Sequence, residues 1–469
     1  MFIHVVKAGE SLWQIANNYH VPMAPIILAN GLTDPNVLVV GEALVIPMGE
    51  VVYIVKPGDT LWKIAQNYGV SVQYILQNNS IANPNIISPG QTIYIPVMRY
   101  SVMAGDTLWK IARRYGVSLQ NLIQTNNIVD PNNISPGIVL VIPRKTRPKI
   151  SVNGYIYKLG QGALPIVRKD GGHLTYLSPF AYLIKEDASL EPISDGPALQ
   201  TAEEEGVIPM MAVTNFTATS KGENLASIVL NNPTLVEQLL TNIISIMQQK
   251  GYQGLNIDFE NVLPRDREAY NSFLERAAIR MHANGYFLST SVAPKTGPEQ
   301  VGLLYEAHDY PAHGRIADFV ILMTYEWGYR KGPPQAISPI NKIRKVLDYA
   351  VSVIPRDKIY LGFQIYARDW TLPHKEGDEA ETFSPQEAVA RAAQYGADIQ
   401  YDYTAESPFY RYTDAQGKAH EVWFEDARSA QAKFDAVKDY NLAGISYWAL
   451  GYPFPQNWVL LEDNFMVKR

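Results

Sequence analysis

Cysteine is absent from the 469 residues of this chain, which excludes both a disulfide framework and a thiolate site for a metal ion. No apolar run reaches the roughly eighteen residues of a membrane-spanning helix, so we predict no membrane span. The net charge of -6 lacks the basic excess of nucleic-acid-binding proteins, and we expect no nucleic-acid partner. These absences leave a large, mildly acidic chain whose length suggests about two to four domains.

Signals for export, metal binding and phosphate binding are missing as well. Residues 1–10 lack the basic and apolar regions of a secretory signal peptide, so we expect none. The 8 histidines are scattered without HExxH spacing, and no glycine-rich phosphate loop occurs. We therefore predict a protein that uses neither a metal ion nor another cofactor.

The first third of the chain is a threefold repeat. Segments 6–16, 55–65 and 103–112 share the pattern Gly-Glu/Asp-Ser/Thr-Leu-Trp. The glycines of this pattern, Gly9, Gly58 and Gly105, lie 49 and 47 residues apart, and each copy closes on Ile-Pro. A repeat of this length is one structural unit, so we predict three small modules.

The second copy shows the organisation of one module. Asp59 or Thr60 can cap a helix, and Gly69 ends it. Apolar residues follow the cap at the spacing of a buried helical stripe: Leu61, Ile64, Ala65 and Tyr68. Ser71 can cap a second helix, and residues 83–85 turn the chain toward a closing strand. We therefore predict a strand–helix–helix–strand (βααβ) unit.

Each copy also contains a tryptophan directly after the leucine that starts this stripe. A unit of under about fifty residues without disulfides has a small core and needs large apolar side chains to fill it. We therefore expect these tryptophans to be core residues: Trp13, Trp62 and Trp109.

Each copy resembles a LysM module over its full length. The resemblance implies binding to glycans that contain N-acetylglucosamine, such as peptidoglycan or chitin, in a groove between the first and last loops. The implied groove residues are Gly58, Asp59, Thr60, Asn83, Pro84, Asn85 and Ile86 in the second copy, and Gly105, Asp106, Thr107 and residues 130–132 in the third. The first copy departs from this pattern with Glu10-Ser11 and a shortened segment 35–38. Tandem modules would prolong residence on a polymer through effective concentration.

From residue 152 onward, apolar strand-like segments alternate with amphipathic helices, which indicates an α/β fold. The predicted strands are 152–157, 176–183, 207–213, 254–259, 287–292, 319–325, 359–365 and 444–448. Eight strands fit one (β/α)8 TIM barrel, with a doubly wound sheet as the alternative. Segment 144–149, with its proline and clustered charge, is predicted to be a linker, or an ordered crossover.

The connection between the seventh and eighth strands is too long for one helix. It contains a hairpin pattern at residues 409–424 with a turn at 414–417, which predicts an insertion. The aromatic side chains of this hairpin either wall a sugar cleft or pack the hairpin on the barrel. Asp426 is interpreted as a helix cap.

The segment Gly251–Val262 combines a buried strand with a row of polar side chains. Because side chains alternate along a strand, one face carries Leu255, Ile257 and Phe259, and the other carries Asn256, Asp258 and Glu260. Buried acids cost several kcal/mol unless paired, and adjacent like charges raise each other's pKa. That arrangement suits catalysis by a protonated acid beside an ionised one, with a structural ion-pair cluster as the alternative.

This segment is similar to the signature of glycoside hydrolase family 18, Asp-x-x-Asp-x-Asp-x-Glu at the end of the fourth barrel strand. Asp258 matches the last Asp, Glu260 matches the catalytic Glu, and Asn256 replaces an earlier Asp. Residues 323–326 resemble the Met-x-Tyr-Asp element of the family, and residues 444–448 resemble its last strand. The resemblance implies a (β/α)8 TIM barrel over residues 152–465, with a small α+β insertion at about residues 369–430.

The resemblance also implies a retaining mechanism in which the acetamido oxygen of the substrate attacks the anomeric carbon. Glu260 would act as acid and then as base, and Asp258 would orient the acetamido group. Tyr325 would hold the acetamido oxygen, and Trp448 would form the floor beneath the sugar; for both, a role in the barrel core is the alternative. The further substrate-binding candidates are Glu326, Trp327, Phe180 and Tyr182.

Asn256 is the departure from the family pattern within the catalytic strand. Its amide can still hydrogen-bond to Asp258, but it can neither share a proton nor add a like charge. We therefore expect the pKa of Asp258 to be less perturbed than in family members with a third acid.

The three modules, the missing signal peptide and residues 256–261 and 423–426 together look like the spore-cortex-lytic N-acetylglucosaminidases of endospore-forming bacteria. The resemblance implies cortex peptidoglycan as substrate and the spore as location. Alternatives are a chitinase, a catalytically silent glycan-binding protein and a spore-coat protein. The domains are predicted at 1–48, 51–97, 99–144 and 150–469, and the oligomeric state stays open.

Overall fold

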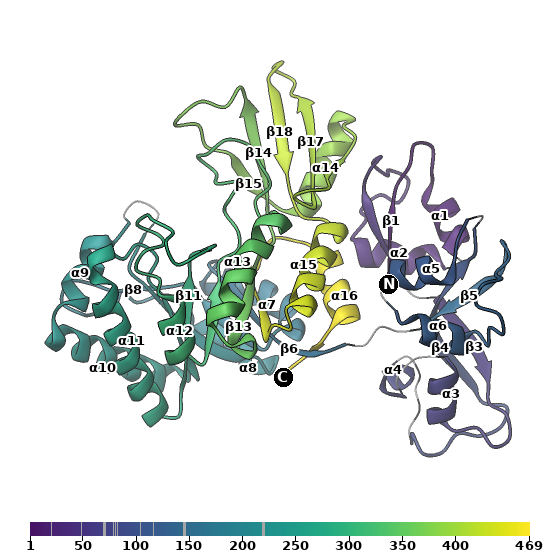
Figure 1. Ribbon diagram of the computed structural model, residues 1–469, viewed down its shortest axis with the longest axis horizontal. Helices are drawn as coiled ribbons and strands as arrows, with labels where there is room; N and C mark the ends of the chain where they lie inside the picture. The colour runs from purple at the N-terminus through teal and green to yellow at the C-terminus, as the bar shows by residue number, and fades with distance from the viewer. Residues whose placement is uncertain are drawn as a thin grey trace. The chain divides into compact units, whose positions relative to one another are not determined.

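The structure is a computed structural model of residues 1–469 (Figure 1). It describes all of them except His20, Met48, 69–71, Asn78, Ser80, Ala82, Ala104, Gly116, 144–146 and 218–220. Two units are described separately: residues 1–147 with 392–399 and 455–465, and residues 148–391 with 400–454 and 466–469. The predicted helix end at Gly69, the cap at Ser71 and half of the predicted linker 144–149 lie outside the described residues. The predicted domain boundaries stay a prediction.

Each repeat copy forms the predicted strand–helix–helix–strand unit. The first copy consists of β1 (Phe2–Val5), α1 (Leu12–Tyr19), α2 (Met23–Asn30) and β2 (Ala43–Ile46). The other two comprise β3 (Gly49–Ile54), α3 (Leu61–Asn67), α4 (Val72–Gln77), β4 (Thr92–Ser101), α5 (Leu108–Tyr115), α6 (Leu119–Thr125) and β5 (Val139–Ile142). β4 pairs antiparallel with β3 through its first half and with β5 through its second half. The second and third modules are therefore joined by one continuous strand.

An asparagine at or just after the end of the second helix ties each module together, which the sequence analysis missed. The Nδ2 of Asn30, Asn79 and Asn126 donates to a carbonyl one turn back and to a carbonyl of the closing strand. Their Oδ1 atoms accept a backbone N–H of that strand at 2.7, 2.8 and 2.6 Å. Each carboxamide thus joins helix to strand in the same way in all three copies.

The prediction that segment 35–38 of the first copy is shortened is wrong. Gly41, Gly90 and Gly137 occupy the same place in the three loops, with φ of 83°, 87° and 91°. Their N–H groups donate to equivalent carbonyls, of Val6, Val55 and Val102, each at 2.8 Å. Because these glycines follow the first-loop glycine at the same spacing in every copy, segment 35–38 keeps its length and differs only in sequence.

The prediction that the three tryptophans are core residues is also wrong. Trp13, Trp62 and Trp109 are 63%, 65% and 56% exposed. In the second copy, Leu61, Ile64 and Ala65 fill the core together with strand residues. These three lie at positions i, i+3 and i+4 and form one apolar stripe of the helix. The tryptophan at i+1 is rotated by about 100° from the centre of that stripe and therefore faces solvent.

Eight parallel strands of the second unit close into the predicted barrel. They are β6 (Lys149–Ile156), β7 (Tyr176–Pro179), β9 (Ile208–Thr214), β10 (Gly254–Asp258), β11 (Phe287–Val292), β12 (Phe319–Leu322), β13 (Ile359–Gln364) and β19 (Gly444–Trp448). Their order is β10-β11-β12-β13-β19-β6-β7-β9, and the pairing of β9 with β10 closes the ring. The (β/α)8 TIM barrel is thus confirmed, and the doubly wound alternative is wrong.

The predicted strands end earlier than expected at two places. The strand predicted at 176–183 is split into β7 and a short β8 (Tyr182–Leu183) that pairs with β9. The strand predicted at 319–325 ends at Leu322, so Tyr325 and Glu326 lie on the loop that follows β12. A short β20 (Met466–Val467) pairs with β6.

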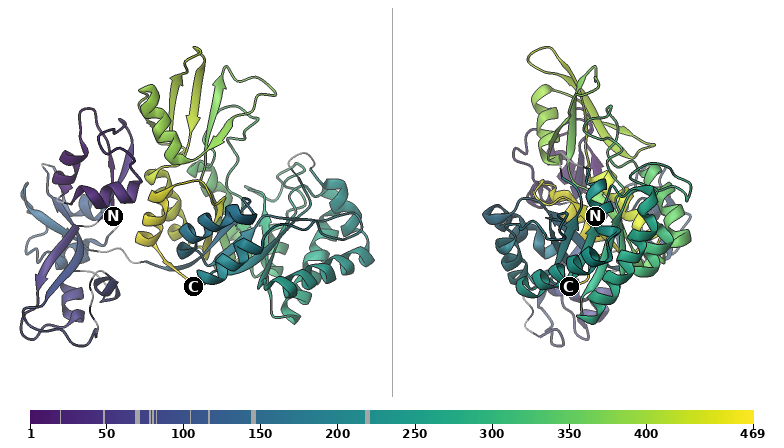
Figure 2. Two further views of the ribbon diagram at one scale, coloured as in Figure 1. Left: turned by 180° about the vertical axis from the view of Figure 1, so that it is seen from behind. Right: turned by 90° about the vertical axis from the view of Figure 1, so that its left-hand side faces the viewer.

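Helices connect and follow the barrel strands, and Figure 2 shows those of the second unit from two further sides. They are α7 (Leu164–Asp170), α8 (Gly196–Glu204), α9 (Glu223–Leu230), α10 (Pro233–Lys250), α11 (Arg267–Ala283), α12 (Tyr310–Ile316), α13 (Ile340–Val353) and α15 (Ala427–Asp439). The last helix of the chain, α16 (Pro455–Asn464), belongs to the first unit. Single 3-10 turns cover Gly160–Ala163, Gly171–His173, Pro264–Asp266 and Arg356–Lys358.

An antiparallel sheet with one helix is inserted between β13 and β19, as predicted. Its strands, in the order β15-β14-β18-β17-β16, are β14 (Ala367–Leu372), β15 (Glu381–Phe383), β16 (Gln400–Asp402), β17 (Ser407–Thr413) and β18 (Ala419–Trp423), with α14 (Pro385–Tyr395). The predicted hairpin is β17–β18. Asp426 caps α15 by accepting the N–H groups of Arg428 and Ser429 at 2.8 and 3.1 Å, which confirms its interpretation as a cap.

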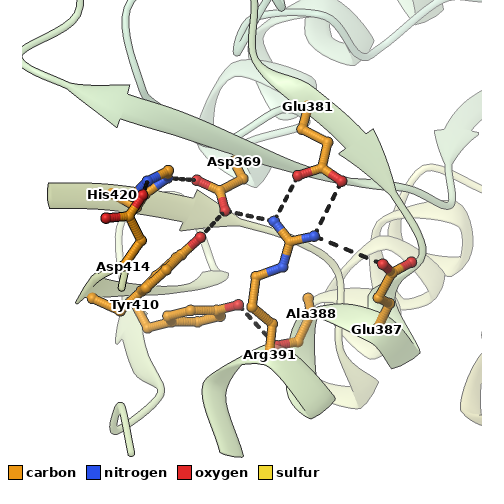
Figure 3. Close-up of polar contacts among 9 residues, drawn as sticks. Asp369, Glu381, Glu387, Ala388, Arg391, Tyr410, Asp414 and His420 are labelled. Atoms are coloured by element: carbon orange, nitrogen blue, oxygen red, sulfur yellow. Dashed lines mark hydrogen bonds and ion pairs between the residues drawn. The ribbon is translucent and has the colours of Figure 1, made fainter. Parts of the chain in front are cut away.

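A buried carboxylate holds this insertion together (Figure 3). Asp369 of β14 accepts hydrogen bonds from His420 Nδ1 at 2.8 Å, Arg391 Nη1 at 2.6 Å and Tyr412 OH at 2.6 Å. Arg391 also pairs with Glu381 at 2.8 Å. One carboxylate thereby joins four elements of the insertion, namely β14, α14, β17 and β18.

Candidate active site

The end of β10 carries the two predicted catalytic carboxylates. Asp258 is its last residue and is 4% exposed, and Glu260, two residues later, is half-buried. Phe259 between them is fully buried and stacks on Tyr270 and Phe273 of α11 at 5.8 and 5.7 Å between ring centroids. The strand alternation therefore places Phe259 against α11 and turns both carboxylates away from that helix, at the carboxyl end of the barrel.

Asn256 lies one step below Asp258 and connects three barrel strands. Its Oδ1 accepts from Tyr155 OH at 2.8 Å and Ser291 Oγ at 3.3 Å, and its Nδ2 donates to Ser289 Oγ at 3.0 Å. The expected hydrogen bond to Asp258 is not formed, because the amide is engaged across the barrel. The Oδ1 atom of Asp258 is instead buried without a hydrogen-bond partner.

The protonation of the site is set mainly by burial. Burial raises the pKa of Asp258 and of Glu260, and the charges of Asp258 and Glu326 raise the pKa of Glu260 further. Burial, together with the neighbouring Tyr155 and Asp258, raises the pKa of Tyr325 well above its usual range, so its hydroxyl stays a donor. Glu260 can therefore hold a proton near neutral pH, as a general acid must.

The carboxylate of Glu326 is bound by two residues that the sequence analysis missed. Arg368 of β14 forms a bidentate pair with it, with Nη2 to Oε1 at 2.7 Å and Nη1 to Oε2 at 2.9 Å. The hydroxyl of Tyr366 also donates to Oε1. Glu326 has a φ of +68°. Its predicted contact with substrate stays a prediction, and the structure shows that an arginine from the insertion offsets its charge.

Trp448 lies in an aromatic cluster at the end of β19. It is half-buried and packs edge-on against Phe180 at 4.7 Å and Tyr155 at 5.6 Å between centroids. Phe180, which follows β7, is half-buried as well. Both rings thus keep an exposed part, and both contact Tyr155, the hydrogen-bond partner of Asn256. Their predicted contacts with substrate stay predictions.

Tyr182 does not lie with these rings, and the prediction that it binds substrate is wrong. It is 1% exposed within the core between the strands and the helices, and its hydroxyl donates to Asp195 at 2.5 Å. Trp327 is half-buried beside Lys342, and it lines a cavity of about 540 Å³ with Tyr305. Its contact with substrate stays a prediction.

Two aromatic side chains of the hairpin, Trp423 and Tyr410, are buried. Trp423 is 8% exposed and stacks on Phe409 at 4.6 Å, and Tyr410 is fully buried. Of the two alternatives for this hairpin, the packing role therefore holds for Trp423 and Tyr410.

His308 positions the catalytic strand end, and the scattered histidines gave no signal for this role. Its Nδ1 accepts the N–H of Ala293 at 2.8 Å, so its Nε2 carries the proton and donates to the carbonyl of Phe259 at 2.9 Å. That carbonyl belongs to the residue between Asp258 and Glu260. Burial lowers the pKa of His308 to about 4, so the neutral ring fixes the end of β10.

We expect the contribution of His308 to the free energy of unfolding to fall as the pH is lowered from 6.5 to 4. His308 stays neutral in the folded state down to its pKa of about 4, while the unfolded chain takes up a proton below 6.5. This difference amounts to about 3 kcal/mol. Urea unfolding of the parent and of His308→Gln at pH 7 and 4.5 isolates this contribution. On going from pH 7 to 4.5 the free energy of unfolding of the parent should change less favourably than that of the variant, and an equal change in both proteins would contradict the assignment to His308.

The predicted groove residues of the modules have internal partners. In each module an acidic side chain of the first loop accepts a hydrogen bond from the backbone N–H three residues before it. The acceptors are Glu10, Asp59 and Asp106, at 2.8, 2.7 and 2.9 Å. Thr60 and Thr107 accept the N–H of the residue three positions on, each at 3.2 Å. Gly58 and Gly105 have φ of 85° and 84°, which requires glycine. These side chains shape the loop, and their glycan contacts, like those of Pro84, stay predictions.

The described residues contain neither a candidate membrane-spanning helix nor a candidate metal site. No helix among them is long and apolar enough to cross a membrane. Across the same part of the chain, no three His, Asp or Glu side chains converge in a way that could hold a metal ion.

Comparison with known proteins agrees with this geometry. A family model described as glycosyl hydrolases family 18 matches residues 180–452, and the LysM domain model matches residues 4–47, 53–96 and 100–143. A cortical fragment-lytic enzyme of Bacillus subtilis (strain 168) is 45% identical over 332 residues, or 69% of this chain and 77% of that protein.

Solved structures are similar as well. The spore cortex-lytic enzyme SleL of Bacillus megaterium QM B1551 has a TM-score of 0.78 at 38% identity, covering 99% of this chain and 98% of that one. A chitinase from Chromobacterium violaceum ATCC 12472 has a TM-score of 0.62 at 25% identity, covering 67% and 98%. Since the family 18 model spans more than half of the residues, this chain is a glycosidase of glycosyl hydrolases family 18 that carries three LysM domains.

Proposed function

We propose that this chain hydrolyses β-1,4 glycosidic bonds of N-acetylglucosamine in the cortex peptidoglycan of bacterial spores during germination. The observation that carries the catalytic part is the carboxylate pair at the end of β10, where burial raises the pKa of both Asp258 and Glu260. The choice of polymer is supported by the relative described as a cortical fragment-lytic enzyme and by the three LysM domains.

Glu260 starts the reaction as the acid. It gives its proton to the glycosidic oxygen while the bond from that oxygen to the anomeric carbon breaks. The acetamido oxygen of the same sugar attacks the anomeric carbon, so the substrate supplies the nucleophile and proximity replaces a bimolecular encounter. Water then attacks that carbon, the bond from the carbon to the acetamido oxygen breaks, and the water gives a proton to Glu260, which restores the carboxylic acid. Two successive displacements at the same carbon retain its configuration.

Asp258 and Tyr325 hold the acetamido group during these steps. The Oδ1 of Asp258 is a buried acceptor without a partner, which fits an N–H of the substrate. The ionised carboxylate would also stabilise the positive oxazolinium-like intermediate. The high pKa of Tyr325 keeps its hydroxyl available as a donor to the acetamido oxygen.

We expect the charge of Glu326 to raise the pKa of the acid Glu260 and so to shift the pH–rate profile. Glu326→Gln removes one of the negative charges that raise the pKa of Glu260, so the alkaline limb of the pH–rate profile should move to lower pH. Arg368→Gln removes the positive charge that offsets Glu326, so the pKa of Glu260 should rise and the alkaline limb of the profile should move to higher pH. Each shift should be on the order of half a pH unit. Shifts in the same direction for both variants would contradict this role.

The LysM domains would anchor the enzyme to the glycan, and the spore is the proposed location. A chitinase is the alternative within the same reaction class, supported by the similarity to a bacterial chitinase structure. A peptidoglycan-binding coat protein without turnover is the alternative outside it.

The test is mass spectrometry of the products from spore cortex peptidoglycan fragments, with borohydride reduction to label new reducing ends. New N-acetylglucosamine reducing ends would support the proposal. Release of chitobiose from chitin oligomers without cleavage of the cortex fragments would favour the chitinase. Binding without cleavage of either polymer would favour the coat protein.

A further inference from the structure

Three tryptophans at the same helix position are exposed, whereas the other five tryptophans of this chain are buried or half-buried. Trp13, Trp62 and Trp109 are 63%, 65% and 56% exposed. By contrast, the tryptophans of the second unit's insertion, Trp370 and Trp423, are 1% and 8% exposed. Since the first helix of each module contributes leucine, isoleucine and alanine to the core from a different face, packing in the core does not account for this threefold recurrence.

Each tryptophan follows a loop that the module holds in place. The lysine after the ring reaches back to the loop glycine, with Lys63 Nζ to Gly58 O at 2.9 Å and Lys110 Nζ to Gly105 O at 3.0 Å. In the first copy Gln14 takes this position, and its Oε1 accepts the N–H of Ser11 at 2.9 Å. The tryptophan therefore lies on the first turn of a helix, next to a loop that side chains of the same module hydrogen-bond.

We propose that Trp13, Trp62 and Trp109 are stacking platforms for the pyranose rings of a glycan strand. The indole face is large, flat and apolar, and it loses little conformational freedom on binding, so it suits the apolar face of a sugar ring. One residue repeated at a fixed period matches a ligand that itself repeats, which favours a polysaccharide over a single protein partner. The fixed loop beside each ring lowers the ordering cost of binding.

The continuous strand β4 gives the second and third platforms a fixed spacing. It passes from one module into the next without a linker, so Trp62 and Trp109 belong to modules joined through one sheet. Binding at one of these modules then raises the effective concentration of the strand at the other. This inference rests on the proposed function, because it takes the glycan as the ligand.

The test is the binding of the full chain to insoluble cortex peptidoglycan by depletion, in a Glu260→Gln background that does not degrade the polymer. Each single Trp→Ala variant should weaken binding on the order of threefold to tenfold, and the triple variant should lose more than any single one. Trp→Phe at the same positions keeps an aromatic face and should retain part of the binding. Circular dichroism checks that each variant is folded.

The controls are two aliphatic residues of the modules that are more exposed than the tryptophans. Leu28 is 82% exposed and Val129 is 98% exposed, so Leu28→Ala and Val129→Ala remove apolar surface without an aromatic face. Both should bind as the parent does. Parent-like binding by the triple tryptophan variant would overturn this inference, and the products of the wild-type chain on soluble fragments would still test the proposed function separately. A parent chain that does not bind the polymer would overturn it too.

Discussion

Glu260→Gln is expected to lower kcat/KM on soluble cortex peptidoglycan fragments by about 10²- to 10⁴-fold, the usual worth of a general acid. The amide keeps the shape of the side chain and can neither donate the proton to the glycosidic oxygen nor take one from water. The measurement is the release of new reducing ends under single-turnover conditions. Binding to insoluble peptidoglycan should persist, because the LysM domains are unchanged.

The same variant should not lose stability, which separates a chemical effect from a folding effect. The pKa of Glu260 is raised in the folded state by burial, so this acid lowers the free energy of unfolding at pH values above its unfolded pKa. The neutral amide removes that cost. The matched control is Glu268→Gln, the same chemical change at an exposed position on α11, which should leave turnover unchanged. Full turnover by Glu260→Gln would refute the catalytic assignment.

Lys433→Met is expected to lower the free energy of unfolding of the catalytic domain by about 3–5 kcal/mol. Lys433 Nζ pairs with Glu425 Oε2 at 2.8 Å, and both side chains are 1% exposed. The other oxygen of Glu425 accepts from Gln364 at 2.7 Å. Without the lysine, a buried carboxylate remains with one amide partner, so its desolvation is no longer offset. Urea unfolding of the barrel transition measures the loss.

Two further variants identify the cause of that loss. Glu425→Gln combined with Lys433→Met removes both charges and should recover part of the stability. Arg276→Met breaks the exposed pair with Glu237, whose side chains are 47% and 49% exposed, and should cost less than about 1 kcal/mol. An equal loss from the exposed and the buried pair would contradict the explanation.

The sequence determined those features that depend on spacing along the chain. The threefold repeat, the eight barrel strands, the hairpin and the cap at Asp426 were all predicted, because helical and strand periodicity and turn residues act within a few positions. The alternation along β10 likewise separated Phe259 from Asp258 and Glu260 before any tertiary contact was known. The exposure of the tryptophans was also within reach, since position i+1 lies off the apolar stripe.

The tertiary structure alone decided which distant residues meet. The partners of Asn256 are on β6 and β11, Glu326 is held by Arg368 from the insertion, and His308 reaches back to the carbonyl of Phe259. Tyr182 illustrates the converse, because sequence proximity to Phe180 did not reveal that the chain starts a new strand there and turns the ring into the core. Closing a barrel brings together side chains that are dozens to hundreds of positions apart, and no local pattern records those contacts.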